Sequence, residues 1–344
     1  MSDATALLVQ SIDRLLTDIC TTEEIEHAET VGWSANIWSA LADAGFAWVG
    51  IDESGGGSGG TVEDLAAILR AVGRFAAPVP IAETAMLGGW CLAEAELALP
   101  AGPVSLFDQS ASVAIVDGRL RVDGVVAWGR HAERVVATST SGAEHRVYSL
   151  RPEQINVTPG ANLAGEARDR ISADVAIADV DQGVIGCSSL ELQQRGALSR
   201  VIMAAGALGA MAQMTVDYTN ERHQFGKPVA TFQAVQHHLV TVTQCAVRAQ
   251  MVADIAVRAL QCGDCALEIA AARVVTDDAI TLGTRAAHQA HGAMGVTREY
   301  PLHQLSRRLW SWRHEWGTTT TWRRRLGAEV VAAGPDGLFG LITR

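Results

Sequence analysis

The spacing of apolar residues changes twice along this chain, and the two changes limit the folds open to it. Up to residue 102, apolar side chains recur every three or four residues, as in LLVQSIDRLLTDI and WSANIWSALADAGF, which predicts amphipathic helices. From 103 to 187 come short β-branched runs separated by Gly, Asp and Ser, which predict antiparallel strands: VSLFD, SVAIVDG, LRVDGVVAW, RVVATS and HRVYSL. From 188 onward, long Ala- and Leu-rich segments predict helices again. We therefore expect an α+β multidomain fold with an N-terminal helical domain (1–102), a middle β domain (103–187) and a C-terminal helical domain (188–344).

Charge and composition exclude several classes of partner. The chain has 27 basic and 38 acidic residues and a net charge of -11, so its surface should repel nucleic-acid backbones. No apolar run approaches the roughly 18–20 residues that cross a bilayer. The N-terminus begins acidic and lacks the basic and apolar regions of a signal peptide. We expect a cytoplasmic protein that binds neither nucleic acid nor membrane.

Two short motifs have a metal-binding or phosphate-binding alternative that the sequence does not favour. Cys262 and Cys265 have the spacing of a metal or redox pair, but no second pair completes a set of four ligands, so no metal is expected. The glycine-rich run 55–60 precedes a helix that should begin after Thr61, with Asp64 in the capping-box position. It lacks the lysine and hydroxyl residue of a P-loop, which favours a plain turn.

The most informative stretch runs from residue 218 to 237. A helix should end near Arg222, a Gly-Pro turn should follow, and a new helix should carry Gln233 and Gln236. An arginine at a helix end, beside exposed backbone amides, favours an anion such as a pyrophosphate, and Phe225 would stack on a planar ligand or wall it off. The alternative is an ordinary helical hairpin with Arg222 in a surface salt bridge.

This stretch resembles the flavin-binding turn of the acyl-CoA dehydrogenases, R-x-x-F-G followed by a Phe-Gln pair. The segment HQAHGAMGVTREYP at 288–301 resembles the glutamine, glycine-rich turn and E-Y-P of that family. The segments VGIDESGGGSGG and ILRAVGRFAAPVPIAET resemble its first-domain loop and helix end. The resemblance covers most of the chain in the right order, and it implies an acyl-CoA dehydrogenase-like fold.

The resemblance implies FAD bound between the β domain and the C-terminal helices, with a neighbouring subunit closing the adenosine side. The residues that it assigns to the cofactor are Arg222, Gln224, Phe225, Gln233, Gln289, Gly292, Ala293, Trp128 and Thr318. Ala293 stands where the family usually has a second glycine. Trp128 matches the tryptophan near the flavin ring, and its alternative is a core tryptophan in the strand LRVDGVVAW.

Two departures from the family concern substrate and catalysis. The family's threonine-glutamate, glycine-rich and serine-aspartate loop has no counterpart in LPAGPVSLFDQSASVAIVDG. Trp316 stands where many members carry the catalytic glutamate before a Gly-Thr pair, and Glu315 lies one residue earlier. On a helix that shift turns a side chain by about 100°.

Some members place the glutamate on an earlier helix, and the equivalent position, near Gly196, has no acid. Glu315 is therefore the remaining candidate for the catalytic base, with His314 as a weaker one. The alternative for Glu315 is an ion pair with Arg313 or with Arg307 or Arg308.

The resemblance implies α,β-dehydrogenation of an acyl-CoA thioester to the trans-2-enoyl-CoA, as in β-oxidation and lipid metabolism, with electrons passed to an electron-transfer flavoprotein. The alternative is a non-catalytic subunit that completes the FAD site of a second acyl-CoA dehydrogenase subunit. A third hypothesis is an oxidase or monooxygenase of the same fold. A homo- or hetero-oligomer is expected in each case. The arginines between 307 and 325 alternate with tryptophans, which indicates packed helices rather than a nucleic-acid surface.

Overall fold

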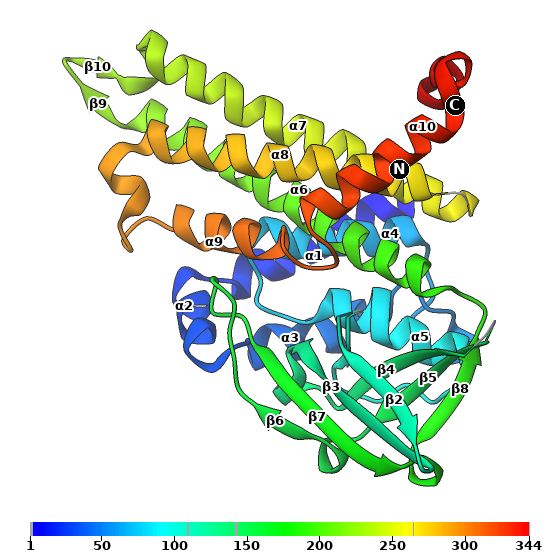
Figure 1. Cartoon of the computed structure of the whole chain (residues 1–344). Coiled ribbons are helices and arrows are strands. Elements are labelled where there is room, and N and C mark those ends of the chain that lie inside the picture. Colours follow the sequence, from blue (N-terminus) through cyan, green and yellow to red (C-terminus); the bar gives the residue numbers. More distant parts are fainter. Residues whose placement is uncertain (1–2, 109, 142–143, 264, 344) are drawn as a thin grey trace. The chain divides into compact units, whose positions relative to one another are not determined.

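The computed structural model describes residues 3–108, 110–141, 144–263 and 265–343. These form two compact units, residues 1–199 and 200–344. The elements follow the order helical, β, helical (Figure 1), which confirms the predicted fold class. The three predicted domain ranges stay predictions.

The first unit begins with a series of helices. They are α1 (Asp3–Ile19), α2 (Thr22–Val31), α3 (Ala35–Asp43), α4 (Val62–Arg74), the π-helix η3 (Ala82–Gly88) and α5 (Gly89–Glu94). Of these, α2, α3 and α4 have side-chain N-caps. The predicted capping box is confirmed, since the Thr61 hydroxyl accepts from the Asp64 amide and the Asp64 carboxylate accepts from the Thr61 amide. The π-helix was not predicted, because periodicity does not separate a π-helix from an α-helix over seven residues.

The segment AWVGID (residues 47–52) is not a β-strand. It forms the 3-10 turn η1 (Phe46–Trp48) and a single bridge between Ile51 and Gly59. The glycine run folds back against this segment, and a Cβ at Gly57 would lie 2.1 Å from the Ile51 carbonyl oxygen. Glycine is needed there because two backbone segments meet closely.

Two four-stranded sheets make up the β part of the first unit. One sheet has the order β1 (Val104–Leu106), β4 (Arg134–Ser141), β5 (Glu144–Leu150), β8 (Asp181–Ile185). The other has the order β2 (Ser112–Val116), β3 (Arg119–Ala127), β7 (Arg168–Ala176), β6 (Asn156–Thr158). All five predicted runs are strands, whereas β6, β7 and β8 had not been identified individually.

One strand pair is parallel, which corrects the expectation of antiparallel strands throughout. Val104 pairs with Arg134 and Leu106 with Val136, so β1 and β4 run in the same direction. A parallel pair needs a crossover connection, and β2 and β3 of the other sheet supply it. The buried apolar core draws on both sheets, with Leu120 and Ile171 from one and Tyr148 and Leu150 from the other.

The second unit is helical apart from one small hairpin (Figure 1). It contains most of α6 (Ser189–Glu221), the hairpin β9 (His223–Gln224) and β10 (Lys227–Pro228), α7 (Gln233–Cys262), α8 (Ala266–His291), α9 (Leu302–Trp312) and α10 (Thr319–Thr343). Gly263 ends α7 in the left-handed region with φ 90°, which lets the chain turn back into α8. Gly334, with φ 67° and ψ 176°, breaks α10 before Pro335.

Helix α6 corrects the expectation that no segment has the length and hydropathy to cross a membrane. By length and composition alone it is sufficient, because it has 33 residues and an 18-residue window with a mean hydropathy of 1.3. However, 78% of that window is buried inside the protein. The helix is therefore buried to the extent expected of a core helix.

Candidate functional site

The hairpin after α6 is built around a tight two-residue turn. Phe225 and Gly226 both have left-handed backbones, with φ 53° and 80°, between the short strands β9 and β10. The Arg222 amide donates to the Tyr218 carbonyl, and the Val229 amide donates to the Arg222 carbonyl, at 2.9 and 2.8 Å. The predicted succession of helix end, turn and new helix is confirmed.

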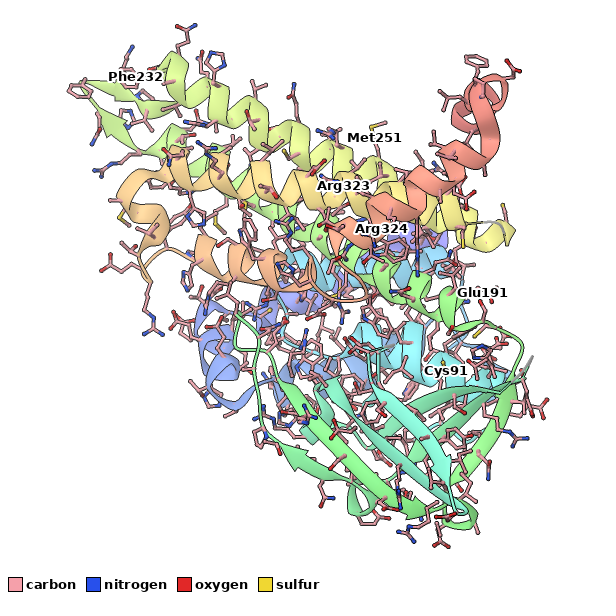
Figure 2. The ribbon with its side chains drawn as sticks, in the orientation of Figure 1. Cys91, Glu191, Phe232, Met251, Arg323 and Arg324 are labelled. Carbon is pink, nitrogen blue, oxygen red and sulfur yellow. The ribbon has the colours of Figure 1, made fainter. Side chains whose placement is uncertain are left out.

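Side chains on this hairpin are exposed. Arg222, Gln224 and Gln233 are all exposed, and 90% of Phe225 is accessible. Phe225 meets the edge of the Phe232 ring at 6.0 Å, and the Lys227 ammonium lies 4.4 Å from the centre of that ring. Phe232 lies at the hairpin end of the unit (Figure 2). We call residues 222–233 the cationic turn, because they present two positive charges, amides and an apolar ring to whatever binds there.

A second exposed turn follows α8. The helix ends at His291, and Gly292 has φ 60° and ψ -137°, a conformation that essentially only glycine adopts. Gln289, Gly292 and Ala293 are exposed, and nothing lies within 4 Å of a Cβ built at Gly292. We call residues 289–293 the glycine turn. Its exposed backbone suits the close approach of a polar group.

Aromatic side chains bring the cationic turn and the glycine turn to the same end of the unit. Tyr218, in the last turn of α6, stacks on His291 with ring centres 4.5 Å apart. Tyr300 meets the Tyr218 ring edge at 5.3 Å and donates to the Met214 carbonyl at 3.3 Å. Tyr300 belongs to the E-Y-P segment, and its role in joining the two turns was not predicted from the sequence.

His291 should make the stability of this end depend on pH. Its Nδ1 donates to the Ala287 carbonyl at 2.8 Å, and its buried Nε2 has no hydrogen-bond partner among the described residues. Burial lowers the pKa of His291 below the ordinary value of 6.5. A pKa lowered by folding favours the neutral ring, so its contribution to stability is complete above pH 6.5 and is lost as pH falls below it.

His291→Phe, which keeps an aromatic ring in the stack, should therefore reduce the loss of stability in acid. Below about pH 6.5, the number of protons taken up on unfolding, which sets the slope of the unfolding free energy against pH, should fall by up to about one. Thermal unfolding of parent and variant between pH 7.5 and 5 measures this. Parallel curves for the two proteins would contradict the assignment.

The candidate base lies in a second region of the unit, between α9 and α10. Residues 313–317 form a turn, so the expectation that Glu315 lies on a helix is wrong. Helix α9 ends at Trp312, and Trp316 and Gly317 in the turn that follows have left-handed backbones, with φ 58° and 104°. Glu315 pairs with Arg200 of α6, at 2.6 Å between Nε and Oε2, and Arg200 is a partner that was not predicted from the sequence.

Buried charges surround this turn. Arg273 of α8 donates to the Trp312 carbonyl at 3.0 Å and lies 3.4 Å from Asp277. The Thr319 hydroxyl donates to Asp277 at 2.7 Å. Thr318 caps α10 by accepting from the Thr321 amide at 3.2 Å. These contacts can hold the backbone turn in place.

The two regions lie far apart along α8. Asp277 and Gln289 are twelve residues apart on this helix, which corresponds to about 18 Å at 1.5 Å per residue. A ligand that touches both within one chain must be extended, or two chains must each supply one region.

Trp128 lies in the first unit and is almost fully buried. Its indole Nε1 donates to the Gly32 carbonyl at 3.0 Å, and the Arg168 guanidinium lies 4.6 Å from the centre of its ring. Its backbone is left-handed, with φ 52°. These contacts join the β part to the loop after α2, as a core tryptophan does, and its placement near a flavin stays a prediction.

Trp128→Phe should lower the unfolding free energy by about 1–2 kcal/mol, because the indole hydrogen bond to Gly32 is lost. Urea unfolding measures the change. Trp33→Phe is the matched control, since it keeps an aromatic ring on His131, whose ring centre lies 4.8 Å from that of Trp33. An unchanged midpoint for Trp128→Phe would show that the bond contributes nothing.

Similar proteins agree on one family. A model of the acyl-CoA dehydrogenase C-terminal domain matches residues 191–331. Acyl-CoA dehydrogenase FadE27 of Mycobacterium tuberculosis is 26% identical over 360 residues, 93% of this chain and 95% of that protein. Acyl-CoA dehydrogenase IpdE2 of Mycolicibacterium smegmatis is 25% identical over 337 residues, 96% of this chain and 100% of that protein. The chain is thus similar to acyl-CoA dehydrogenases over nearly its whole length, and residues 191–331 match the C-terminal domain of that family.

Solved structures show the acyl-CoA dehydrogenase fold along nearly the whole chain. The ChsE4-ChsE5 complex of Mycobacterium tuberculosis contains a chain with a TM-score of 0.86 at 22% identity, covering 97% of this chain and 99% of that one. Butyryl-CoA dehydrogenase from Megasphaera elsdenii has a TM-score of 0.81 at 16% identity, covering 96% and 99%. The predicted family resemblance is confirmed.

The residues of this region that were not predicted from the sequence are the buried charges. Arg200, Arg273 and Asp277 lie in Ala-rich helical segments, where a charge needs a partner. The signal available in the sequence was the i,i+4 spacing of Arg273 and Asp277. Arg200 and Glu315 carried no such signal, because 115 residues separate them.

Proposed function

We propose that this chain takes part in FAD-dependent α,β-dehydrogenation of an acyl-CoA thioester to the trans-2-enoyl-CoA, with electrons passed to an electron-transfer flavoprotein. The observation that carries the proposal is the cationic turn lying beside the glycine turn at one exposed end of the helical unit. Bound FAD supplies the acceptor for the hydride that leaves Cβ of the substrate. The proposal includes the cytoplasmic location expected from the sequence.

The residues present fit a phosphate-bearing cofactor. An exposed guanidinium forms strong charge-assisted hydrogen bonds with phosphate oxygens, so we assign the diphosphate to Arg222. The side-chain amides of Gln224, Gln233 and Gln289 have both donors and acceptors for the adenosine portion. Gly292 lets the backbone approach closely, and Ala293 adds only a methyl group. Trp128 and Thr318 stay proposed contacts on the flavin side.

The proton removed from Cα needs an acceptor opposite the cofactor. Within this chain Glu315 is the acceptor that the sequence leads one to expect. Its ion pair with the buried Arg200 opposes that role, because an ion-paired carboxylate is stabilised in its charged form and is a weaker base.

That ion pair favours a second candidate function, in which this chain completes the FAD site of a homologous subunit that carries the base. The exposed cationic turn suits such a role, since the 90% exposed Phe225 has a large apolar surface available to a partner. The ChsE4-ChsE5 complex among the similar structures consists of two differently named chains. We propose an oligomer, with itself or with a second acyl-CoA dehydrogenase subunit.

Expression alone and with a homologous acyl-CoA dehydrogenase subunit tests both functions. A yellow protein that bleaches with acyl-CoA when purified alone supports its own catalysis. A colourless protein that becomes yellow and active only in the complex supports the second candidate. A complex that retains no flavin would contradict both.

A further inference from the structure

Arg200 places a positive charge inside the helical unit. Its side chain is 1% exposed, and that of Glu315 is 19% exposed. Arg200 follows Ser199 in α6 and precedes the apolar run VIMAAGALGA. A buried guanidinium needs a counter-charge, and Glu315 supplies one at 2.6 Å.

The turn that carries Glu315 is held from several sides as well. Arg273 donates to the Trp312 carbonyl, where α9 ends. Arg313 donates to the Thr281 hydroxyl of α8 at 3.0 Å. The fully buried Trp322 of α10 donates from its indole to the Trp316 carbonyl at 3.1 Å. Each contact fixes a backbone group or a side chain of residues 312–316.

Trp316 itself has a backbone conformation that a bulky residue rarely adopts. Its φ of 58° costs energy for any side chain with a Cβ, and such a conformation persists only where the surroundings hold it. Trp316 is also buried, at 6% exposure. Glu315, the residue directly before it, is the one tied to Arg200.

We propose that the Arg200–Glu315 pair is a lock that holds the α9–α10 turn and so places the buried Trp316 where the family resemblance puts a base. Glu315 is then a positioning residue, and it does not accept the substrate proton. The lock itself follows from the contacts alone, whereas its consequence for catalysis rests on the proposed function. To act as a base, Glu315 would have to give up its pairing with the guanidinium of Arg200, whose side chain is only 1% exposed.

A double-mutant cycle tests the lock in the full chain. Arg200→Met and Glu315→Gln should each raise the unfolding equilibrium constant roughly 150- to 5000-fold, because each removes one charge of this ion pair and leaves the other in place. The double variant should return to within about tenfold of the parent, because both charges of the pair are then removed together. Arg323→Met is the control. It breaks the Arg323–Asp278 pair of α10 and α8, whose side chains are 57% and 46% exposed, and should change the constant by about fivefold or less.

Trypsin gives a readout that general destabilisation would not reproduce. The bond between Arg313 and His314 lies in the locked turn, so each single variant should be cut there first and about tenfold or more faster than the parent. The double variant should be cut more slowly than either single one. If a single variant aggregates, Glu315→Asp, whose shorter side chain weakens the pair, replaces it and should show the same selective cleavage.

Flavin bleaching by acyl-CoA in the assembled enzyme separates a lock from a base. If the pair is a lock, the double variant should recover flavin bleaching together with stability. If Glu315 is the base, the double variant should bleach at least about 100-fold more slowly than the parent. Additive destabilisation in the double variant, or an Arg313 bond as resistant in the single variants as in the parent, would overturn the lock. An assembly that never bleaches counts against the proposed function only, because unfolding and cleavage are measured without substrate.

Discussion

Arg222→Ala should weaken flavin retention roughly 30- to 150-fold. The exposed Arg222 side chain lies in the cationic turn, beside the glycine turn. Loss of one charge-assisted contact with a phosphate costs about 2–3 kcal/mol, and each 1.4 kcal/mol is a factor of ten in the dissociation constant. Flavin absorbance after gel filtration of the complex, followed by titration of the apoprotein with FAD, measures the change.

Arg258→Ala is the matched control for this prediction. Arg258 is also an exposed arginine of the helical unit, near the far end of α7 from the hairpin, and its loss removes the same charge. Flavin content should be unaffected in this variant. Equal flavin loss in the two variants, or none in either, would remove the assignment of the cationic turn to the cofactor.

Asp277→Asn should lower the unfolding free energy by about 3–5 kcal/mol. The Arg273 and Asp277 side chains are 2% and 1% exposed, and the variant leaves the guanidinium without its nearest counter-charge. Burial raises the pKa of Asp277 and lowers the pKa of Arg273, so desolvation opposes both charges. Replacing both residues, as in Arg273→Met with Asp277→Leu, should therefore restore most of the lost stability.

The neighbouring Asp278→Asn is the control for the buried pair. Asp278 pairs with Arg323 on the surface, and such pairs contribute about 1 kcal/mol or less. Urea unfolding of the four proteins gives the comparison. If Asp277→Asn lowered the unfolding free energy as little as Asp278→Asn does, burial would not be what makes the Arg273–Asp277 pair important for stability.

Features determined by neighbouring residues were predictable from the sequence. Helical periodicity predicted α1 and α3, the Thr61–Asp64 capping box predicted the start of α4, and β-branched runs predicted β1 to β5. The break after Arg222 was also predicted, because glycine and proline act locally on the backbone. Local propensity and the hydrophobic period are properties of short windows, and they were enough for the order of elements and the fold class.

Only the tertiary structure decided which distant groups meet. The parallel pairing of β1 with β4 depends on a crossover through the other sheet, and the joining of the two turns depends on Tyr218 stacking on His291. The pairing of Glu315 with Arg200, 115 residues away, has the same origin. A buried charge takes its partner from whichever helix packs against it, and no short window of sequence contains that information. The sequence by itself therefore determined where the cationic turn and the glycine turn lie, whereas packing decided that Glu315 pairs with the buried Arg200.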